Sequence, residues 1–393
     1  MLIIVKQIER GNIMKKQTKK ILAGVLAIAT LFLATPVSDI STSPLTLKST
    51  YAASAETYTY EDLEYKIVDD EIFITDCDES VTEVVIPSEI DGLPVTNIYD
   101  KAFDYCSKLE SITIPDSVSS IGDRAFNGCT SLTSITIPDS VTSIGSWAFN
   151  GCKSLTSVTI PDSITGIKWG VFKDCTSLES VTIPDSVTII RYDAFWGCTS
   201  LTSIIVNENN LQFSDIDGVL FNKDKTTLIQ YPIGRTSKEY AIPDSVTSIG
   251  DSAFWSCKSL TSIIIPDSVT SIGDYAFDDC TSLASVTIPS SVETIKSISF
   301  DVKFLKTIYG YTDSAAETYA NEKGITFIAL DGEFETGDLS GDGILDSVDV
   351  TFLKQTINGR QPLSPNQSKA ADINGDGKLN VFDLVLLKKT IIN

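Results

Sequence analysis

The sequence predicts a repeat solenoid of short parallel strands, followed by a small all-α module. Residues 81–308 repeat with a period of 23 residues, which is the first observation behind this fold class. Each repeat carries a short apolar–polar alternation that ends at a proline, which is typical of a strand with one buried face. The third observation is a second duplication within 337–393, where the pattern of 338–357 recurs at 372–391.

The repeat unit explains how one coil is built. The segment LTSITIPDSVTSIGSWAFNGCKS begins at Leu132, and LTSVTIPDSITGIKWGVFKDCTS follows at Leu155. The alternation in Ile135–Ile137 predicts a strand, and Pro138 ends it because proline cannot donate to a strand ladder. Four apolar residues then return inward to fill the coil, namely Val141, Ile144, Ala148 and Phe149.

One coil cannot bury its apolar face alone, so the repeats must stack and share a core. About ten coils at a strand spacing of about 4.8 Å give a solenoid roughly 50 Å long. The expected coils start near Val81, Leu109, Leu132, Leu155, Leu178, Leu201, Ser237, Leu260, Leu283 and Leu305.

Departures from the period mark an insertion and two caps. The coil at Leu201 is longer than the others, and we interpret its extra piece near 207–236 as a hairpin. We expect strands at 218–221 and 226–231, joined by a turn at 222–225. The resulting organisation is a signal region at 1–55, an N-terminal β cap at 56–80, a solenoid at 81–330 closed by a helix (314–323) and a strand (325–330), a linker at 331–336 and the helical module at 337–393.

The N-terminus predicts secretion. Residues 14–20 are strongly basic, and 21–34 form an apolar run of 14 residues, which is short for a membrane span but typical of a signal peptide. We place cleavage between about 36 and 55, where Ala53–Ala55 supplies a small-residue site. Either Met1 or Met14 is the start of translation. We therefore expect a secreted protein with no membrane span after signal removal.

Composition excludes several functions. The net charge of −22 argues against nucleic acid as a partner, since phosphate binding requires lysine and arginine. The chain has no histidine, which excludes a Ser-His-Asp triad, a Cys-His protease and a histidine-ligated zinc site. Carboxylate chemistry remains, either as an acid–base pair or as a site for a hard cation.

The eight cysteines are best explained as buried free thiols. Seven of them recur at the repeat period, which places one cysteine per coil at the same position. Neighbouring thiols would then point in parallel rather than toward each other, which disfavours disulfides. Cys77 lies outside this pattern and has no obvious partner in the sequence.

Aromatic residues at variable positions are the candidate ligand contacts of the solenoid. Such positions on a rigid repeat are where a binding surface can be built. The alternative is that these rings only cover the outer turns and pack on each other. The four candidates are Trp147, Trp169, Trp196 and Trp255.

Two 12-residue loops predict calcium binding. Residues 338–349 and 372–383 place oxygen donors at positions 1, 3, 5, 9 and 12 and glycine at position 6. All seven carboxylates between Gly337 and Asn393 occupy these positions, whereas a merely solvated face would scatter them. The expected ligands of two calcium ions are Asp338, Ser340, Asp342, the Ile344 carbonyl, Asp346 and Asp349, and Asp372, Asn374, Asp376, the Lys378 carbonyl, Asn380 and Asp383.

An amphipathic helix follows each loop. The first copy has Val350, Leu353 and Ile357 at helical spacing, and the second copy has apolar residues at the same positions. No entering helix precedes Asp338, and position 12 is Asp rather than Glu, so the pair is not an ordinary EF-hand.

These motifs resemble two known families. The recurring IPxSVTxIGxxAFxxC pattern resembles the BspA-type leucine-rich repeat, found in secreted and surface proteins of bacteria. The stretches GDLSGDGILDSVDVTFLKQTI and ADINGDGKLNVFDLVLLKKTI resemble the type I dockerin. That resemblance implies calcium-dependent binding to a cohesin domain of a scaffoldin, and so assembly into a cellulosome. By the same resemblance, partner contacts fall on Ser347, Val348, Lys354 and Gln355 in the first copy, and on Val381, Phe382, Lys388 and Lys389 in the second.

Three functions are compatible with this organisation. The favoured one is a non-catalytic, cellulosome-associated protein whose solenoid recognises protein, glycan or a surface in a polysaccharide-degrading system. A surface adhesin for host or community binding is the alternative. A glycoside hydrolase is less favoured, because acidic residues of the solenoid recur in each coil, as at Asp116, Asp139 and Asp162, whereas a catalytic pair should be singular.

The second dockerin copy is the expected main cohesin face, since Val381 and Phe382 offer a larger apolar anchor.

Overall fold

The structure is a computed structural model that describes residues 56–332, 334–358 and 363–392. The expected signal region, 1–55, lies outside the described residues. The chain divides into Met1–Ser54 and Ala55–Asn393, and the solenoid and the helical module both belong to the second unit.

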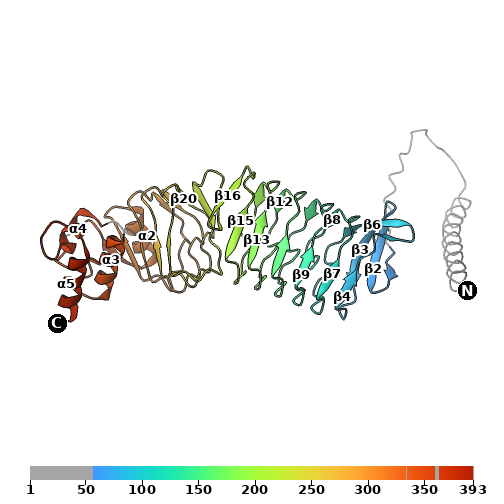
Figure 1. The fold of residues 1–393 in the computed structure, drawn as a ribbon, viewed down its shortest axis with the longest axis horizontal. Helices are drawn as coiled ribbons and strands as arrows, with labels where there is room; N and C mark the ends of the chain where they lie inside the picture. The colour runs from blue at the N-terminus through green and yellow to red at the C-terminus, as the bar shows by residue number, and fades with distance from the viewer. Residues whose placement is uncertain (1–55, 333, 359–362, 393) are drawn as a thin grey trace, which may run out of the picture. The chain divides into compact units, whose positions relative to one another are not determined.

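Short parallel strands stacked coil on coil build the solenoid, which confirms the predicted fold class (Figure 1). The strands pair in register, so that Ser134, Ser157 and Ser180 lie side by side at equivalent positions of successive coils. This first face consists of β4 (Glu83–Val85), β7 (Ser111–Thr113), β9 (Ser134–Thr136), β11 (Ser157–Thr159), β13 (Ser180–Ile183), β15 (Ser203–Val206), β19 (Glu239–Ala241), β21 (Ser262–Ile264), β23 (Ser285–Thr287) and β25 (Thr307–Gly310).

A second short strand per coil was not anticipated from the sequence. The segment after the proline turn predicted only inward-pointing side chains, but its Ser-Ile pair also hydrogen-bonds to the neighbouring coils. Two residues are too few to show a periodicity of two, so no pattern distinguishes them from a loop. This second face consists of β8 (Ser120–Ile121), β10 (Ser143–Ile144), β12 (Gly166–Ile167), β14 (Ile189–Ile190), β20 (Ser248–Ile249), β22 (Ser271–Ile272) and β24 (Thr294–Ile295).

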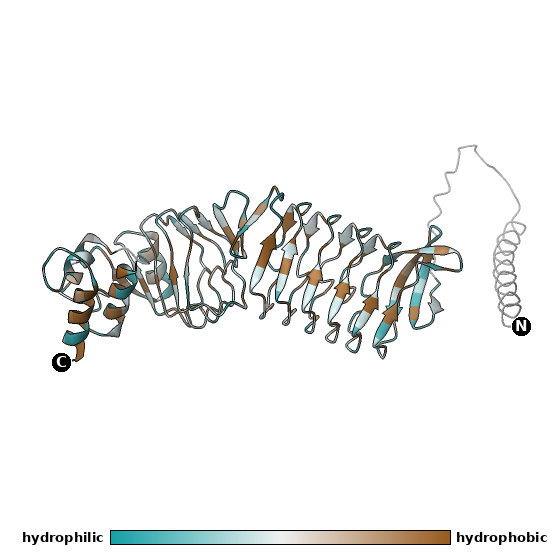
Figure 2. Cartoon of the chain, in the orientation of Figure 1, coloured by the Kyte–Doolittle hydropathy of each residue, from teal (hydrophilic) through white to brown (hydrophobic). Residues whose placement is uncertain are grey.

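The core is a set of side-chain ladders that run along the solenoid. Phe103 and Phe126 stack with ring centroids 5.0 Å apart, and the series continues through Phe149 to Phe195. Each of these rings is almost fully buried. Hydrophobic residues recur along the successive strands in Figure 2, as a shared core requires.

All eight cysteines are free and buried. Within the repeats, a thiol donates a hydrogen bond to the carbonyl of the phenylalanine 26 residues earlier, as from Cys152 Sγ to Phe126 at 3.2 Å. The same bond recurs from Cys175 to Phe149 at 3.1 Å. Cys77 is buried next to Cys106, because the N-terminal cap folds back onto the first coil.

The N-terminal end is an antiparallel meander that continues into the second face. Its strands are β1 (Tyr58–Tyr60), β2 (Leu63–Val68) and β3 (Glu71–Cys77), and β3 then pairs in parallel with β6 (Leu93–Ile98). The short strand β5 (Glu89–Ile90) pairs with β6. The open edge of the first regular coil is thereby covered by paired strands.

The long coil forms three antiparallel strands, β16 (Phe213–Ile216), β17 (Val219–Asn222) and β18 (Thr227–Gln230). The expected hairpin corresponds to β17 and β18, and β16 extends it. β18 pairs in parallel with β20, so the insertion remains part of the second face. Tyr231 stacks on Phe254 at 5.2 Å and fills the position that phenylalanine holds in regular coils.

A helix and a strand close the far end of the solenoid. The helix α2 (Ala315–Lys323) begins at Ser314, whose hydroxyl accepts from the Glu317 N–H, and it ends at Gly324 in the left-handed conformation. The strand β26 (Thr326–Ala329) pairs in parallel with β25.

The last module contains three helices, α3 (Ser347–Ile357), α4 (Pro365–Ala371) and α5 (Val381–Ile392). Helix α4 was not predicted, because its seven residues are mostly polar; a capping box at Ser364 and Gln367 stabilises its start. Leu353 and Leu387 bring α3 and α5 together in a core that also includes Tyr309 and Leu330 of the solenoid end.

Candidate functional site

The first loop, residues 338–349, buries its first and last acidic side chains. Asp338 at position 1 accepts a hydrogen bond from the Gly343 N–H at 2.8 Å. Asp349 at position 12 accepts from the Ser340 N–H at 2.8 Å and from the Asp346 N–H at 2.9 Å. The bond from the Asp346 N–H to Asp349 also caps the start of α3, so the same residues close the loop and begin the helix.

The second loop, residues 372–383, repeats this geometry. Asp372 accepts from the Gly377 N–H at 2.7 Å. Asp383 accepts from the Asn380 N–H at 3.0 Å and from the Asn374 N–H at 3.4 Å. Because two loops from separate parts of the sequence form the same bonds, the loop geometry follows from their shared donor and glycine positions.

The sixth position requires glycine for conformation rather than for space. Gly343 and Gly377 have φ angles of 77° and 75°, in the left-handed region. A Cβ atom added at either residue would meet nothing within 4 Å. These glycines turn the chain so that position 7 presents a backbone carbonyl, which belongs to Ile344 or Lys378.

The donor set fits a hard divalent cation. Asp338, Asp349 and Asp383 are buried carboxylates, and among the described residues none of them is paired with lysine or arginine. Burial raises the pKa of Asp349 because a charged carboxylate loses its hydration there. A cation held by the loop would offset that cost.

The acidic side chains of the two loops do not converge on one point in either loop. In the described part of the chain, no three acidic or cysteine side chains already form a metal cluster. Asp342 and Asp376 instead accept from backbone N–H groups two residues ahead, each at 2.8 Å. Local turns therefore hold the expected ligands in place.

The residues of the second copy that were predicted to contact a partner are exposed, and the first two of them are apolar. Val381 and Phe382 are 59% and 73% exposed, and Lys388 and Lys389 lie about two turns further along α5. Val385, 56% exposed, joins this surface and was missed in the sequence, although it lies one helical turn after Val381. We use the term second-copy face for these five residues.

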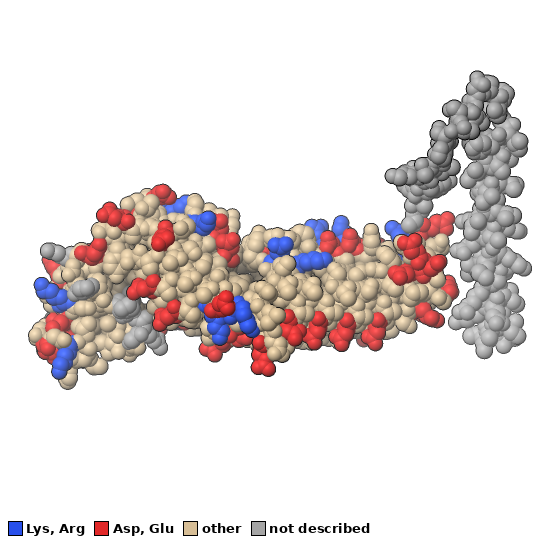
Figure 3. All heavy atoms as spheres, turned by 90° about the horizontal axis from the view of Figure 1, so that it is seen from above, with Lys and Arg blue, Asp and Glu red and all other residues tan. Residues whose placement is uncertain are grey.

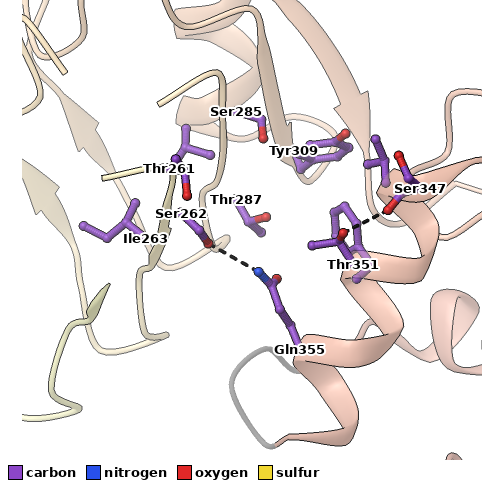
Figure 4. A pocket seen from close by; sticks show the side chains of 12 residues that line it. Thr261, Ser262, Ile263, Ser285, Thr287, Tyr309, Ser347, Thr351 and Gln355 are labelled. Atoms are coloured by element: carbon purple, nitrogen blue, oxygen red, sulfur yellow. Dashed lines mark hydrogen bonds between the residues drawn. The ribbon is translucent and has the colours of Figure 1, made fainter. Parts of the chain in front are cut away.

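The first-copy face, formed by Ser347, Val348, Lys354 and Gln355, lies differently. Gln355 Nε2 donates to Ser262 Oγ of β21 at 3.4 Å. Ser347, Val348 and Gln355 line a cavity of about 250 Å³ together with residues of β21 and β23 (Figure 4). Three of the four residues thus line this cavity and Lys354 does not, although Val348 remains 37% exposed.

A ring contact fixes α3 against the solenoid. Phe352 of α3 packs edge-to-face on Tyr309 of β25, with ring centroids 5.1 Å apart. Asn366 of α4 donates to the Gly332 carbonyl at 3.0 Å. The module therefore touches the solenoid end through two of its helices.

The four candidate tryptophans do not form one continuous cluster. Trp196 and Trp255 stack on each other at 4.7 Å, and Tyr192 connects Trp196 to Trp169. Trp147 does not belong to this series of ring contacts. The Arg124 guanidinium lies over its ring, 5.4 Å from the ring centroid. Trp169 is the most exposed of the four, at 36%.

These features define a leucine-rich-repeat solenoid that carries a duplicated loop-helix module of calcium-binding type. The family model for the BspA type leucine rich repeat region matches residues 96–226 and 235–325 in 6 copies. This is more than half of the 393 residues, so the chain belongs to the BspA-type leucine-rich repeat family. The family model for the dockerin type I domain matches residues 336–392, and neither family is catalytic in type.

The chain is similar to several solved structures of leucine-rich repeat proteins. A leucine-rich repeat protein from Eubacterium ventriosum is 25% identical, with a TM-score of 0.50 over 70% of this chain and 78% of that one. The pneumococcal vaccine antigen PcpA is 18% identical, with a TM-score of 0.48 over 70% of this chain and 98% of that one. A leucine rich cell surface protein from Faecalibacterium prausnitzii is 27% identical, with a TM-score of 0.42 over 71% and 96% of the two chains.

No curated protein matches the chain. Within the described residues, the helices are too short or too polar to cross a membrane.

Proposed function

We propose that the chain is a secreted, non-catalytic component of a cellulosome-type assembly. Its dockerin binds a cohesin domain of a scaffoldin, and its solenoid recognises a protein, a glycan or a surface in a polysaccharide-degrading system. The protein is then held at the cell surface through that assembly. The exposed second-copy face next to two calcium-type loops is the observation that carries this proposal.

Two calcium ions are the proposed cofactors, one in each loop. Calcium supplies the positive charge that lets seven carboxylates share two loops without repulsion. Position 9 differs between the copies: Asp346 in the first loop and Asn380 in the second. The first site therefore has the higher negative charge.

The second-copy face is the proposed cohesin contact. Phe382 and Val381 provide an apolar anchor, and the lysines Lys388 and Lys389 can reach acidic groups at the rim of a partner. The first-copy face is less accessible, because Ser347, Val348 and Gln355 line the cavity between α3 and the solenoid and Val348 is only 37% exposed.

Calorimetry against a panel of cohesins tests this function. The full chain should bind at least one cohesin with calcium and none in EDTA. Phe382→Ala should weaken binding by at least tenfold, since it removes the largest exposed apolar contact. Val348→Ala serves as the matched control and should leave the affinity unchanged; the reverse pattern would refute the proposed face.

A further inference from the structure

The second face of the solenoid is interrupted between β10 and β12. β8 pairs with β10 and β12 pairs with β14, but β10 and β12 are not paired. One coil earlier, the Thr142 N–H donates to the Ser119 carbonyl at 2.9 Å, and the Gly145 N–H donates to Ile121 at 2.8 Å. The equivalent bonds from Thr165 and Lys168 are not formed, although both residues are described.

Residue changes coincide with this gap. Regular coils carry serine in this strand and glycine two residues later, as at Ser143 and Gly145. The next coil has Gly166 and Lys168 instead, and the coil after it has Ile189 and Arg191. Gly166 removes a side chain from the face while two long cationic side chains are added beside it.

The result is a groove of about 380 Å³, near the lower limit of the roughly 300–1,000 Å³ typical of small-molecule sites. We call it the basic groove. The hydroxyl groups of its lining come from Thr142, Ser143, Ser146, Thr165 and Thr188, and its cations are Lys168 and Arg191.

The two cations are held in place without an acidic partner. Lys168 Nζ donates to Ser143 Oγ across the gap at 3.1 Å, and the Arg191 guanidinium lies 5.0 Å from the Trp169 ring centroid. Among the described residues, neither forms an ion pair. Asp193, two residues from Arg191, accepts instead from the Gly170 N–H at 3.1 Å.

Basic side chains are the minority in this chain, with 30 lysines and arginines against 52 aspartates and glutamates. Its net charge is −22, and in Figure 3 acidic side chains form a row along one edge of the solenoid, whereas basic ones occur in small groups. A pair of unneutralised cations in a hollow of an acidic protein favours an anionic ligand. Surrounding hydroxyls and exposed apolar carbon, such as Ile189 at 51%, match the mixed surface of a sugar ring.

We propose that the basic groove binds a short stretch of acidic polysaccharide, with uronic acid carboxylates on Lys168 and Arg191. The Trp169 ring would hold the guanidinium rather than stack on the sugar. This inference deepens the recognition role proposed for the solenoid and rests on it, but it is independent of the dockerin.

A peptide strand fits the gap less well. The coils on either side remain joined, because the Trp147 N–H donates to the Trp169 carbonyl at 2.8 Å and β9, β11 and β13 pair without interruption on the first face. Adding a strand would require separating neighbouring strands by a further 4.7–4.9 Å or so, and these contacts oppose it.

Calorimetry with trigalacturonate and the full chain tests the proposal. Trigalacturonate should bind, whereas a neutral trisaccharide of glucose should not. Lys168→Gly/Arg191→Gly should lower the affinity at least tenfold, and these changes introduce the residue that regular coils carry. Lys296→Gly, made at the equivalent position of a coil whose strands remain paired, should have no effect.

Two further measurements distinguish a failure of this proposal from a failure of the proposed cohesin binding. Gly166→Ser should also weaken binding by filling the groove, and its Cβ meets Ile189 only at ordinary contact distances of 3.7 Å or more. Binding should persist in EDTA, unlike cohesin binding, so either proposal can fail alone. The proposal is overturned if no uronate binds, if Lys168→Gly/Arg191→Gly binds normally, or if a glutamate-rich peptide competes equally well.

Discussion

Cys152 shows why a thiol recurs in almost every coil. Its side chain is fully buried, and its S–H group donates to the Phe126 carbonyl at 3.2 Å. The cysteine thus fills a small apolar space and adds a second donor to a carbonyl that also accepts from the Cys129 N–H at 3.3 Å. The repeat period predicted the burial, but not this acceptor, because the phenylalanine belongs to an earlier coil.

Replacing this thiol should separate its two roles. Cys152→Ala removes one of the two donors to the Phe126 carbonyl, the other being the Cys129 N–H at 3.3 Å, and opens a small cavity, so it should lower the free energy of unfolding by about 1–3 kcal/mol. Cys152→Ser keeps a donor and should cost less. Urea unfolding under reducing conditions measures both. Equal losses for alanine and serine would show that the hydrogen bond contributes nothing.

The thiols also predict a pH dependence. Burial raises the pKa of Cys152 to about 12 from the ordinary 9.0, and it does the same for Cys198 and Cys280. The folded chain therefore keeps these protons where the unfolded chain loses them. The stabilisation is complete below about pH 9 and is lost as the pH rises toward about 12, by up to about 1.4 kcal/mol per pH unit for each thiol.

Urea unfolding at pH 7.5 and at about pH 10.5 tests this dependence. Cys152→Ser should show a shallower loss of stability between the two, since one titrating group has been removed. Constant stability up to the higher pH would contradict the burial of these thiols.

At the scale of elements, strands with a long repeated sequence pattern were predicted correctly, whereas elements with a short or irregular pattern were missed. Ile135–Ile137 and its copies predicted the first-face strands, because alternation and a closing proline recur in each coil. The strands of the second face have two residues, and α4 has seven mostly polar ones, so neither carries a periodic signal. Their formation depends on neighbours that only the folded chain supplies.

The candidate site divides in the same way. The proposed calcium ligands follow from spacing alone, since loop positions are local, and they stay a prediction. The contact of Gln355 with Ser262 of β21 joins residues that are 93 positions apart in the sequence, and the basic groove depends on a missing strand pair. No local pattern reports such contacts.

Gly377→Ala tests the loop as an element. The left-handed φ of 75° costs an alanine about 1–2 kcal/mol, while no atom lies close enough to clash. Calcium affinity of the second loop should therefore fall by about fivefold to thirtyfold, as read by calorimetry. Gly332→Ala, outside both loops, is the control. An unchanged affinity in Gly377→Ala would mean that this glycine does not set the loop geometry.

At the scale of the molecule, a long solenoid core adjoins a small module. The module's core contains few residues of its own and shares Tyr309 and Leu330 with the solenoid. Residues 337–393 are too few to bury much apolar surface, so calcium should supply much of their stability.

Calcium removal should therefore act on one part of the molecule. EDTA should abolish most of the helical circular dichroism, because α3 and α5 begin at the loops, while the solenoid keeps its cooperative thermal transition. Readdition of calcium should restore the helical signal. Helices that persist in EDTA would show that contacts with the solenoid suffice to fold the module.

Hydrogen exchange of the full chain, with calcium and with and without a bound cohesin, tests the central claim most directly. A partner on the second-copy face should protect the backbone amides around Val381–Val385 and along α5. Amides of α3 should exchange as before, since α3 already faces the solenoid. Protection of α3 with no change in α5 would contradict the account.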